Sequence, residues 1–587
     1  MIFPKPKKEE ILSGRYTLKG KYAGALYEFC KELKEDGVDI KYNKNASFEK
    51  EEYKIEIGDS GIYIEYSSDE GKFRALTSLY QLSDGSSVPY CLIYDKPAFS
   101  RRGYMLDISR GRIPKKEKIL RIIDFLCALK YNEFQLYMEN FCFKYSAFPE
   151  FTAGFDCLTP ENIKEIEKYC EDRFIELVPC QNGFGHMRSW LDTDEFKDIE
   201  ITDGKEKTDT LDPENPKSAE LIDRIYLSLF PLFKSKKANI GFDEAMGLGK
   251  FQNEKACAER GRENVFCDYL LKISALAKKY GKDIMIWGDM IINNPECFKR
   301  LPENTTVLEW GYDLIFSSMM EEHCRVLAEH NIPFYTCPSV MNFYSFTGRF
   351  DVMSFNMRTA AELGEKYGAK GYLVTDWGDG GHMANFVWSV VPAALGGQYG
   401  WNTGIKQHGG WLKPEFIHAA ENYADKYVFK AEISRLLYMC GNLYLMEPER
   451  IHGQTICSMM LKKPLCDMDY SPFFNLEEIG DSYYFNNIIN AQAALIRRIE
   501  QSDASEKLKR EITVNAKMNI LGAEYAIVKI NAAVSEEKAD ELCKLSDFII
   551  KEHTEIWLWD NFEEGIGQGI NYIKSRKEEL KNYVGRK

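Results

Sequence analysis

Two adjacent carboxylates, Asp243 and Glu244, are the residues best suited to chemistry in this chain. They end the apolar stretch Asn239-Ile240-Gly241-Phe242, which has the character of a β-strand. Carboxyl groups transfer protons readily, and pairs of them cleave glycosidic bonds. The pair is therefore the first candidate for a catalytic site, with sugar cleavage as its candidate reaction.

Other apolar stretches also end in polar and aromatic residues. These ends carry Arg102 and Asp107, Glu139-Asn140, Gln181, Asn182 and His186, Trp287 and Asp289, Glu309-Trp310, Tyr312-Asp313, Asn342 and Tyr344, and Trp377, Asp379 and His382. Acids and amides hydrogen-bond to hydroxyl groups, while indoles stack on the apolar faces of sugar rings. The combination predicts a site that binds a carbohydrate.

The order of the elements indicates how these residues come together. Strand-like stretches are expected to end near Ile108, Met138, Pro179, Glu244, Met290, Asp313, Pro338 and Asp379, with helical patterns between them. This alternation across residues 98–405 predicts a (β/α)8 TIM barrel, in which functional residues gather at the carboxyl ends of the strands. A doubly wound sheet shows the same alternation, but no glycine-rich dinucleotide fingerprint follows the first strand.

Two further domains are expected. The pattern of residues 1–97 predicts a small α+β domain. Its helices are expected at Lys21–Asp36 and Lys72–Leu82, and a hairpin is expected to turn at Asp59-Ser60-Gly61. Residues 406–587 predict an α-helical domain. Its expected helices are Phe416–Tyr427, Tyr484–Glu500, Glu506–Ala532 and Glu537–Lys551, and packing is expected to explain Trp557 and Trp559.

Composition narrows the class of protein. The net charge of −14 argues against nucleic-acid binding, and no apolar run is long enough to cross a membrane. The sixteen cysteines form no CxxC motif, and the chain does not begin like a signal peptide. These features predict a cytoplasmic enzyme with reduced thiols and no cofactor, and they leave a homodimer open.

Strand geometry suggests how the carboxylates divide their work. Neighbouring residues on a strand project to opposite faces, so Asp243 and Glu244 are not expected to flank one bond at the ~5 Å spacing of a retaining pair. A substrate with a 2-acetamido group resolves this, because its carbonyl oxygen can act as the nucleophile. Asp243 would then orient the acetamido group, and Glu244 would act as general acid and base.

The chain resembles glycoside hydrolase family 20, the β-N-acetylhexosaminidases. The resemblance rests on three motifs: Arg102-Gly103-Tyr104-Met105-Leu106-Asp107-Ile108-Ser109-Arg110, Gly241-Phe242-Asp243-Glu244 and Trp377-Gly378-Asp379. It covers about two thirds of the chain. It implies an exo-acting, retaining enzyme that removes terminal β-linked GlcNAc or GalNAc through an oxazolinium intermediate.

The resemblance also implies roles for single residues. Arg102 would hold the 3- and 4-hydroxyls, Asp379 the 4- and 6-hydroxyls, and Trp287, Trp310 and Trp377 would form walls around the sugar. The tyrosine that bonds the acetamido carbonyl is assigned to Tyr344, with Tyr335 and Tyr312 as rivals. His186 is included as a substrate-binding residue, although a role within its own loop stays open.

Several alternatives remain at this point. A non-catalytic sugar-binding barrel would have the same aromatic walls. A metal-dependent barrel hydrolase could use His186, Asp243, Asp289 and His382, but no HExxH or His-x-His spacing occurs, so no metal is expected. Arg110 and Arg112 are interpreted as structural, Glu309 as a brace for Trp310, and Asn342 as a replacement for a carboxylate.

Overall fold

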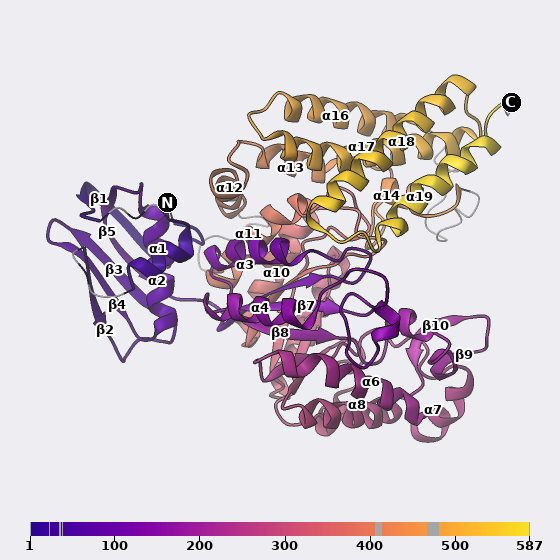
Figure 1. Cartoon of the computed structure of the whole chain (residues 1–587), viewed down its shortest axis with the longest axis horizontal. Helices are drawn as coiled ribbons and strands as arrows, with labels where there is room; N and C mark the ends of the chain where they lie inside the picture. The colour runs from indigo at the N-terminus through magenta and orange to yellow at the C-terminus, as the bar shows by residue number, and fades with distance from the viewer. Residues whose placement is uncertain are drawn as a thin grey trace.

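The computed structural model describes residues 2–20, 22, 24–34, 37, 39–404, 414–465 and 481–585. A small sheet domain, a closed barrel and a group of long helices follow one another along the chain (Figure 1). The sheet domain lies to one side of the barrel, and the C-terminal helices cover another side (Figure 1). Across the described ranges, no helix has the length and apolar character needed to span a bilayer.

The N-terminal domain is a five-stranded sheet in the order β1-β5-β3-β4-β2 with two helices. Its elements are β1 (Lys8–Thr17), α1 (Leu26–Glu32), β2 (Ile40–Lys44), β3 (Tyr53–Gly58), β4 (Gly61–Tyr66), α2 (Asp69–Leu82) and β5 (Ser87–Asp95). The predicted hairpin is confirmed, because β3 and β4 pair up to Gly58 and Gly61 around a two-residue turn. The helix predicted from Lys21 to Asp36 is the shorter α1, and both of those end residues lie outside the described residues.

The predicted barrel is confirmed: eight parallel strands close in the order β11-β12-β13-β14-β15-β6-β7-β8. The strands are β6 (Arg101–Asp107), β7 (Glu133–Met138), β8 (Glu176–Gln181), β11 (Lys237–Asn239), β12 (Asp283–Trp287), β13 (Thr306–Trp310), β14 (Phe334–Cys337) and β15 (Gly371–Asp376). The connecting helices include α3 (Lys116–Ala128), α4 (Pro160–Glu171), α6 (Pro216–Leu229), α8 (Arg262–Lys279), α9 (Ser317–Glu329), α10 (Phe350–Tyr367) and α11 (Val387–Trp401). A short 3-10 helix, η5 (Pro295–Arg300), connects β12 to β13.

Side chains fill the inside of the barrel, as they do in barrels of this size. Met105, Val178, Met285, Leu308 and Leu373 belong to one buried cluster contributed by different strands. Every residue of β7 and β15 is buried, including the polar side chains of Glu133, Gln135, Thr375 and Asp376, because packing covers both faces of these strands. The interior of the barrel is therefore a packed core.

The C-terminal region is helical, as predicted. It comprises α12 (Pro414–Tyr423), the π-helix η7 (Ala424–Phe429), α13 (Ser434–Gly441), η8 (Leu443–Met446), α14 (Ile456–Lys462), α16 (Tyr483–Glu500), α17 (Glu506–Asn531), α18 (Glu536–Asp560) and α19 (Ile566–Glu579). Asn515 of α17 connects this region to the barrel. Its Oδ1 atom accepts a hydrogen bond from Trp388 Nε1 at 3.0 Å, and its Nδ2 atom donates to the carbonyl of Met383 at 2.8 Å. Trp557 is buried and donates to the carbonyl of Phe562. The boundary predicted between residues 405 and 406 lies outside the described residues.

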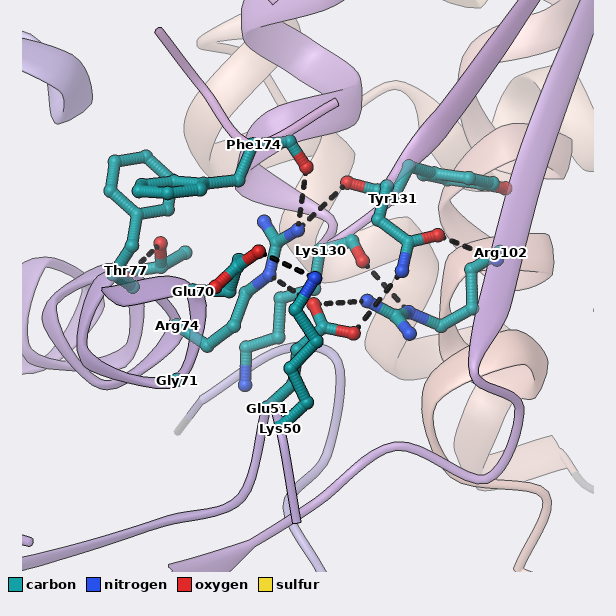
Figure 2. A network of polar contacts seen from close by, with 12 residues as sticks. Lys50, Glu51, Glu70, Gly71, Arg74, Thr77, Arg102, Lys130, Tyr131 and Phe174 are labelled. Atoms are coloured by element: carbon teal, nitrogen blue, oxygen red, sulfur yellow. Dashed lines mark hydrogen bonds and ion pairs between the residues drawn. The ribbon is translucent and has the colours of Figure 1, made fainter. Parts of the chain in front are cut away.

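A buried polar network joins the N-terminal domain to the amino end of β6 (Figure 2). Glu51 accepts hydrogen bonds from Arg74 Nε at 2.9 Å and Arg102 Nη2 at 2.7 Å. Arg74 also donates to the carbonyls of Tyr131 and Phe174 on the barrel side. Because each of these charges has a partner, the interface can bury them without an isolated ion.

Candidate active site

A pocket of about 470 Å³ opens at the carboxyl ends of the barrel strands. Its wall is formed by Arg110, His186, Asp243, Glu244, Trp287, Trp310, Tyr312, Phe343, Tyr344, Trp377, Asp379, His452, Gly453, Gln454 and Lys463. Of the nine site residues that the sequence predicted, eight line this pocket and Arg102 does not. A pocket with aromatic walls and a few convergent polar groups has the general features of a small-molecule site.

Asp243 and Glu244 lie beyond the end of strand β11, which stops at Asn239. The backbone after it is irregular: Gly241, Phe242 and Glu244 all have positive φ, at 73°, 73° and 44°. The expectation that strand alternation sends the two carboxylates to opposite faces is therefore wrong, and both side chains line one pocket. Left-handed backbone at non-glycine residues is concentrated at functional sites, where the surrounding packing holds it in place.

Packing around Gly241 and Phe242 fixes this irregular turn. A Cβ at position 241 would lie 1.9 Å from Asn182 Oδ1, so only glycine fits there. The buried Phe242 ring packs against Phe184 and Tyr269, with centroids 5.4 and 5.8 Å away. Phe242 thus anchors the turn below the pocket while Asp243 and Glu244 face into it.

His186 connects the two carboxylates. Its Nε2 atom lies 3.3 Å from Asp243 Oδ2 and 3.5 Å from Glu244 Oε2. Burial would lower the pKa of His186, but the charge of the nearby Asp243 carboxylate outweighs burial and raises it to about 9. A protonated His186 therefore pairs with Asp243, and the prediction that His186 belongs to the site agrees with its position in the pocket wall.

The two carboxylates have different surroundings. Asp243 is 6% exposed, and its Oδ1 atom is buried without a hydrogen-bond partner among the described residues. The Glu244 side chain is 47% exposed. Burial and the neighbouring Asp243 raise the pKa of Glu244, against the opposing effect of His186. One carboxylate is thus buried with an oxygen that lacks a partner, while the other is more open and has a raised pKa, and such a difference in surroundings gives paired acids separate roles.

Asp289 supports this arrangement from the turn just after strand β12. It accepts the backbone N–H of Glu244 at 3.0 Å and Trp310 Nε1 at 3.3 Å. Burial, together with the charge of Asp243, raises the pKa of Asp289. Asp289 therefore orients Glu244 and Trp310 from behind the pocket wall.

Aromatic side chains form the inner walls of the pocket. Trp287 and Trp377 lie with ring centroids 5.6 Å apart, and Trp310 lies 5.4 Å from Tyr312. Trp377 Nε1 donates to the hydroxyl oxygen of Tyr312 at 2.7 Å. The three predicted tryptophans are thus brought together, with Tyr312 between two of them.

Arg110, interpreted from the sequence as structural, lines the pocket. Its guanidinium lies 3.2 Å from Glu139 Oε2, 3.4 Å from Asp107 Oδ2 and 3.5 Å from Asp379 Oδ2. It also lies over the Trp377 ring, 4.9 Å from the centroid. Arg110 lies three residues after the last residue of β6. Its position just beyond the carboxyl end of a predicted strand is the sequence feature that would have identified it as a pocket residue.

Arg102 does not take part in the pocket, and its predicted role as a hydroxyl-binding residue is wrong. It is the second residue of β6, at the amino end of the barrel, and is 1% exposed. Its side chain donates to Glu51 and to the carbonyls of Lys130 and Phe99. A side chain at the amino end of a strand cannot reach a pocket at the carboxyl end of the same strand.

The three candidate tyrosines occupy different places. Tyr335 lies inside the barrel and donates to Glu133, so it is excluded from the pocket. Tyr344, the first choice, lines the rim and is 38% exposed. Tyr312 lies deeper, and its hydroxyl oxygen already accepts from Trp377, which leaves its own proton to donate. The geometry favours Tyr312 over Tyr344 as a donor inside the pocket.

Three residues whose roles the sequence left open, Glu309, Asn342 and His382, do not line this pocket. Glu309 is 2% exposed and pairs with His323 Nδ1 at 2.8 Å. Asn342 is buried and donates to Ser389. His382 lies in a different cavity, beside Arg112 and Asn385. Among the residues that the structure describes, no group of three or more His, Cys, Asp or Glu side chains is arranged to hold a metal ion.

The C-terminal helical region also contributes to the pocket, which the sequence did not reveal. His452, Gly453, Gln454 and Lys463 come from the segments on both sides of α14. The backbone N–H of Gly453 donates to Asp313 at 2.7 Å, and that of Thr455 donates to the carbonyl of Tyr344 at 3.1 Å. These bonds fix the segment against the barrel, but no local pattern in the sequence indicates such a long-range contact.

Comparisons with known proteins agree with this architecture. The chain matches the family descriptions "Glycosyl hydrolase family 20, catalytic domain" over residues 99–342 and "Glycosyl hydrolase family 20, domain 2" over residues 24–96. Together these ranges exceed half of its 587 residues. It is 25% identical to a β-hexosaminidase of Vibrio furnissii over 385 residues, which are 54% of this chain and 62% of that protein. It is also 25% identical to a lacto-N-biosidase of Bifidobacterium bifidum over 277 residues, 44% of this chain and 24% of that protein.

Solved structures share the fold. A β-N-acetylhexosaminidase of Bacteroides fragilis matches with a TM-score of 0.58 at 20% identity, covering 73% of this chain and 95% of that one. A chitobiase of Flavobacterium johnsoniae matches with a TM-score of 0.58 at 17% identity and covers 98% of both chains. The chain spans less than two thirds of the length of the curated relatives named above. The matches to both domains of one family, over most of the barrel and the domain before it, show that this chain belongs to glycoside hydrolase family 20.

Proposed function

We propose that this protein is an exo-acting, retaining β-N-acetylhexosaminidase that removes terminal β-linked GlcNAc or GalNAc. The observation that carries the proposal is the unsatisfied Oδ1 atom of Asp243 in a pocket with indole walls. A buried carboxylate oxygen without a donor is costly, and an acetamido N–H would satisfy it. Family membership supports the same reaction class.

The first step uses Glu244 as an acid. Asp243 accepts a hydrogen bond from the acetamido N–H, and the hydroxyl of Tyr312 donates a hydrogen bond to the acetamido carbonyl oxygen. Trp287 and Trp377 enclose the acetamido group. Glu244 protonates the glycosidic oxygen as the bond from C1 to that oxygen breaks. The carbonyl oxygen bonds to C1 from the opposite face, which gives an oxazolinium ion and a free alcohol.

The second step reverses the role of Glu244. As a carboxylate it takes a proton from water, the water oxygen attacks C1, and the bond from C1 to the carbonyl oxygen breaks. Two inversions at C1 give net retention. The raised pKa of Glu244 suits this exchange, because the group must be an acid before the first step and a base before the second.

Release of nitrophenol from 4-nitrophenyl N-acetyl-β-glucosaminide tests the proposal. Glu244→Gln should lower kcat/KM by about 10²- to 10⁴-fold on substrates with poor leaving groups and much less on aryl glycosides with good ones. Glu263→Gln, an exposed position on α8, is the matched control and should leave the rate unchanged. Asp243→Asn should also lose activity, because an amide has only one accepting oxygen and no negative charge with which to stabilise the oxazolinium ion. If the wild type binds amino sugars but cleaves none, the protein is a sugar-binding barrel instead.

A further inference from the structure

Asp313 lies behind the pocket wall and holds two other segments of the chain. It follows Tyr312 just after the end of β13, and it does not itself line the pocket. Its Oδ1 atom accepts a hydrogen bond from Arg349 Nη1 at 2.8 Å, and its Oδ2 atom accepts the backbone N–H of Gly453 at 2.7 Å. Gly453 lines the pocket from the C-terminal helical region. One carboxylate thus joins the loop after β13, the loop before α10 and the helical region.

This carboxylate is firmly held. The Asp313 side chain is 11% exposed and that of Arg349 is 1% exposed. Two other nitrogen atoms of Arg349, Nε and Nη2, are buried without a partner within the described ranges. Separation of the pair would leave a buried charge without a counter-ion, which is costly. The N–H of Gly453 therefore donates to an acceptor that cannot easily turn away.

The same contacts surround Tyr312. The Tyr312 ring lies between those of Trp310 and Phe343, with centroids 5.4 and 5.6 Å away. The Arg349 guanidinium lies 5.1 Å from the centroid of the Phe343 ring. Asp313 is the next residue in the chain, so its two hydrogen bonds also restrain the backbone of Tyr312. The position of Tyr312 thus depends on the carboxylate that holds Gly453.

We propose that Asp313 is a positioning residue, which holds Tyr312 in place for the acetamido group by fixing the segment 452–454 of the helical region against the loop after β13. The inference rests on the proposed function, because it explains how Tyr312 is held for its role there. Small displacements of a group that orients the substrate slow a reaction strongly. The helical region then takes part in the reaction, although none of its pocket residues is an acid.

General docking of the helical region is the competing role for Asp313, and Asp560 of α18 allows the two roles to be separated. Asp560 pairs with Arg121 Nη2 at 2.5 Å and Lys118 Nζ at 3.4 Å, both on barrel helix α3, and its side chain is 14% exposed. It lines a different cavity from the active-site pocket. If both aspartates only dock the region, their variants should behave alike. If Asp313 is a positioning residue, its variant alone should affect turnover, and only while Tyr312 is present.

Asp313→Asn tests the proposal, because whichever way the amide is oriented, one of the two partners loses its acceptor. The full chain is assayed on 4-nitrophenyl N-acetyl-β-glucosaminide. We expect kcat/KM to fall ~10- to 100-fold in the wild-type background and less than ~3-fold in a Tyr312→Phe background, where the residue through which Asp313 acts is already lost. Asp560→Asn is the matched control, and it should keep kcat/KM within ~2-fold in both backgrounds whatever its effect on Tm.

Thr455→Ala disturbs the same segment from its other side. The backbone N–H of Thr455 donates to the carbonyl of Tyr344 at 3.1 Å, and its side chain caps α14 by accepting the N–H of Ser458 at 3.2 Å. Loss of this cap should loosen the segment and lower kcat/KM ~3- to 10-fold, again only while Tyr312 is present. This variant tests the inference even if Asp313→Asn does not fold.

Three results would each overturn the inference: unchanged kcat/KM in both variants of the segment, a fall that is equally large in the Tyr312→Phe background, or an equal fall in Asp560→Asn. Calorimetric titration with GlcNAc needs no turnover. If the wild type cleaves nothing, but Asp313→Asn binds GlcNAc ~5-fold more weakly and only while Tyr312 is present, the proposed function fails and the positioning role stands. If the wild type cleaves the substrate and Asp313→Asn matches it, the proposed function stands and the positioning role fails.

Discussion

The two ends of strand β6 carry two arginines with different tasks. Arg102, at the amino end, is 1% exposed and pairs with Glu51 of the small domain. Arg110, just past the carboxyl end, lines the pocket and pairs with Asp379 and Glu139. The amino end of the barrel contacts the small domain, and the carboxyl end holds the pocket. Arg102 and Arg110 are only eight positions apart, yet one belongs to an ion pair between domains and the other to the pocket wall.

The comparison shows why a motif alone does not assign a residue. Both arginines belong to the stretch that carries the family resemblance, and both are charged residues beside buried apolar ones. The seven residues of β6 cover ~20 Å, most of the height of the barrel. Position relative to the strand end decides which arginine lines the pocket.

The largest expected effect is on stability at the amino end. Arg102→Met should lower the free energy of unfolding by ~3–5 kcal/mol, because it removes one partner of a buried ion pair. In molecules that stay folded, kcat/KM should stay within ~2-fold of the wild type, since the pocket is intact. Urea denaturation and the nitrophenol assay measure the two effects. Arg101→Met, which removes the half-exposed pair with Glu176, is the control and should cost no more than ~1 kcal/mol.

The next effect is on turnover at the pocket end. Arg110→Lys should lower kcat/KM ~100-fold with little change in Tm, because an ammonium cannot contact three carboxylates and the Trp377 ring as the guanidinium does. Arg102→Lys is the matched substitution at the other end and should alter stability without altering turnover. A result in which the two lysine variants exchange these effects would break the comparison.

The smallest effect is the pH dependence of stability, which should differ between the ends. Burial would raise the pKa of Glu51, but Arg102 and Arg74 outweigh burial and lower it to about 2. Burial lowers the pKa of Arg102, but the ordinary pKa of a guanidinium lies so far above neutrality that Arg102 stays protonated over this pH range. This contribution is present above the unfolded pKa of 4.5 and is lost as the pH falls toward 2.

At the pocket end, stability changes with pH in the opposite direction. The pKa of His186, raised from 6.5 to about 9, gives stability that is present below pH 6.5 and lost as the pH rises through 9. Each contribution amounts to at most about 3 kcal/mol. Urea midpoints from pH 3 to pH 10 should show that Glu51→Gln flattens only the acid limb and His186→Gln only the alkaline limb. An alkaline limb that persists in His186→Gln would contradict the assignment.

Much of the fold could be predicted from the sequence because the signals are local. The hairpin around Asp59 and Ser60 and the eight barrel strands follow from apolar patterning and turn residues. The placement of Trp287, Trp377 and Asp379 followed as well, because residues at strand ends must gather at one face of a barrel. The short hairpin of β9 (Glu200–Thr202) and β10 (Lys207–Leu211) was not predicted, since both strands are too brief to show a pattern.

The sequence by itself determined that a barrel presents Asp243, Glu244 and a set of tryptophans at one end, because strand period and strand-end chemistry are properties of neighbouring residues. Only the tertiary structure decided that both carboxylates face His186, because the backbone after Asn239 leaves the strand and its path depends on the packing of Phe242. It also decided that the segment around Gly453 reaches the pocket. Those contacts join residues far apart in the chain, and their positions depend on how whole domains pack.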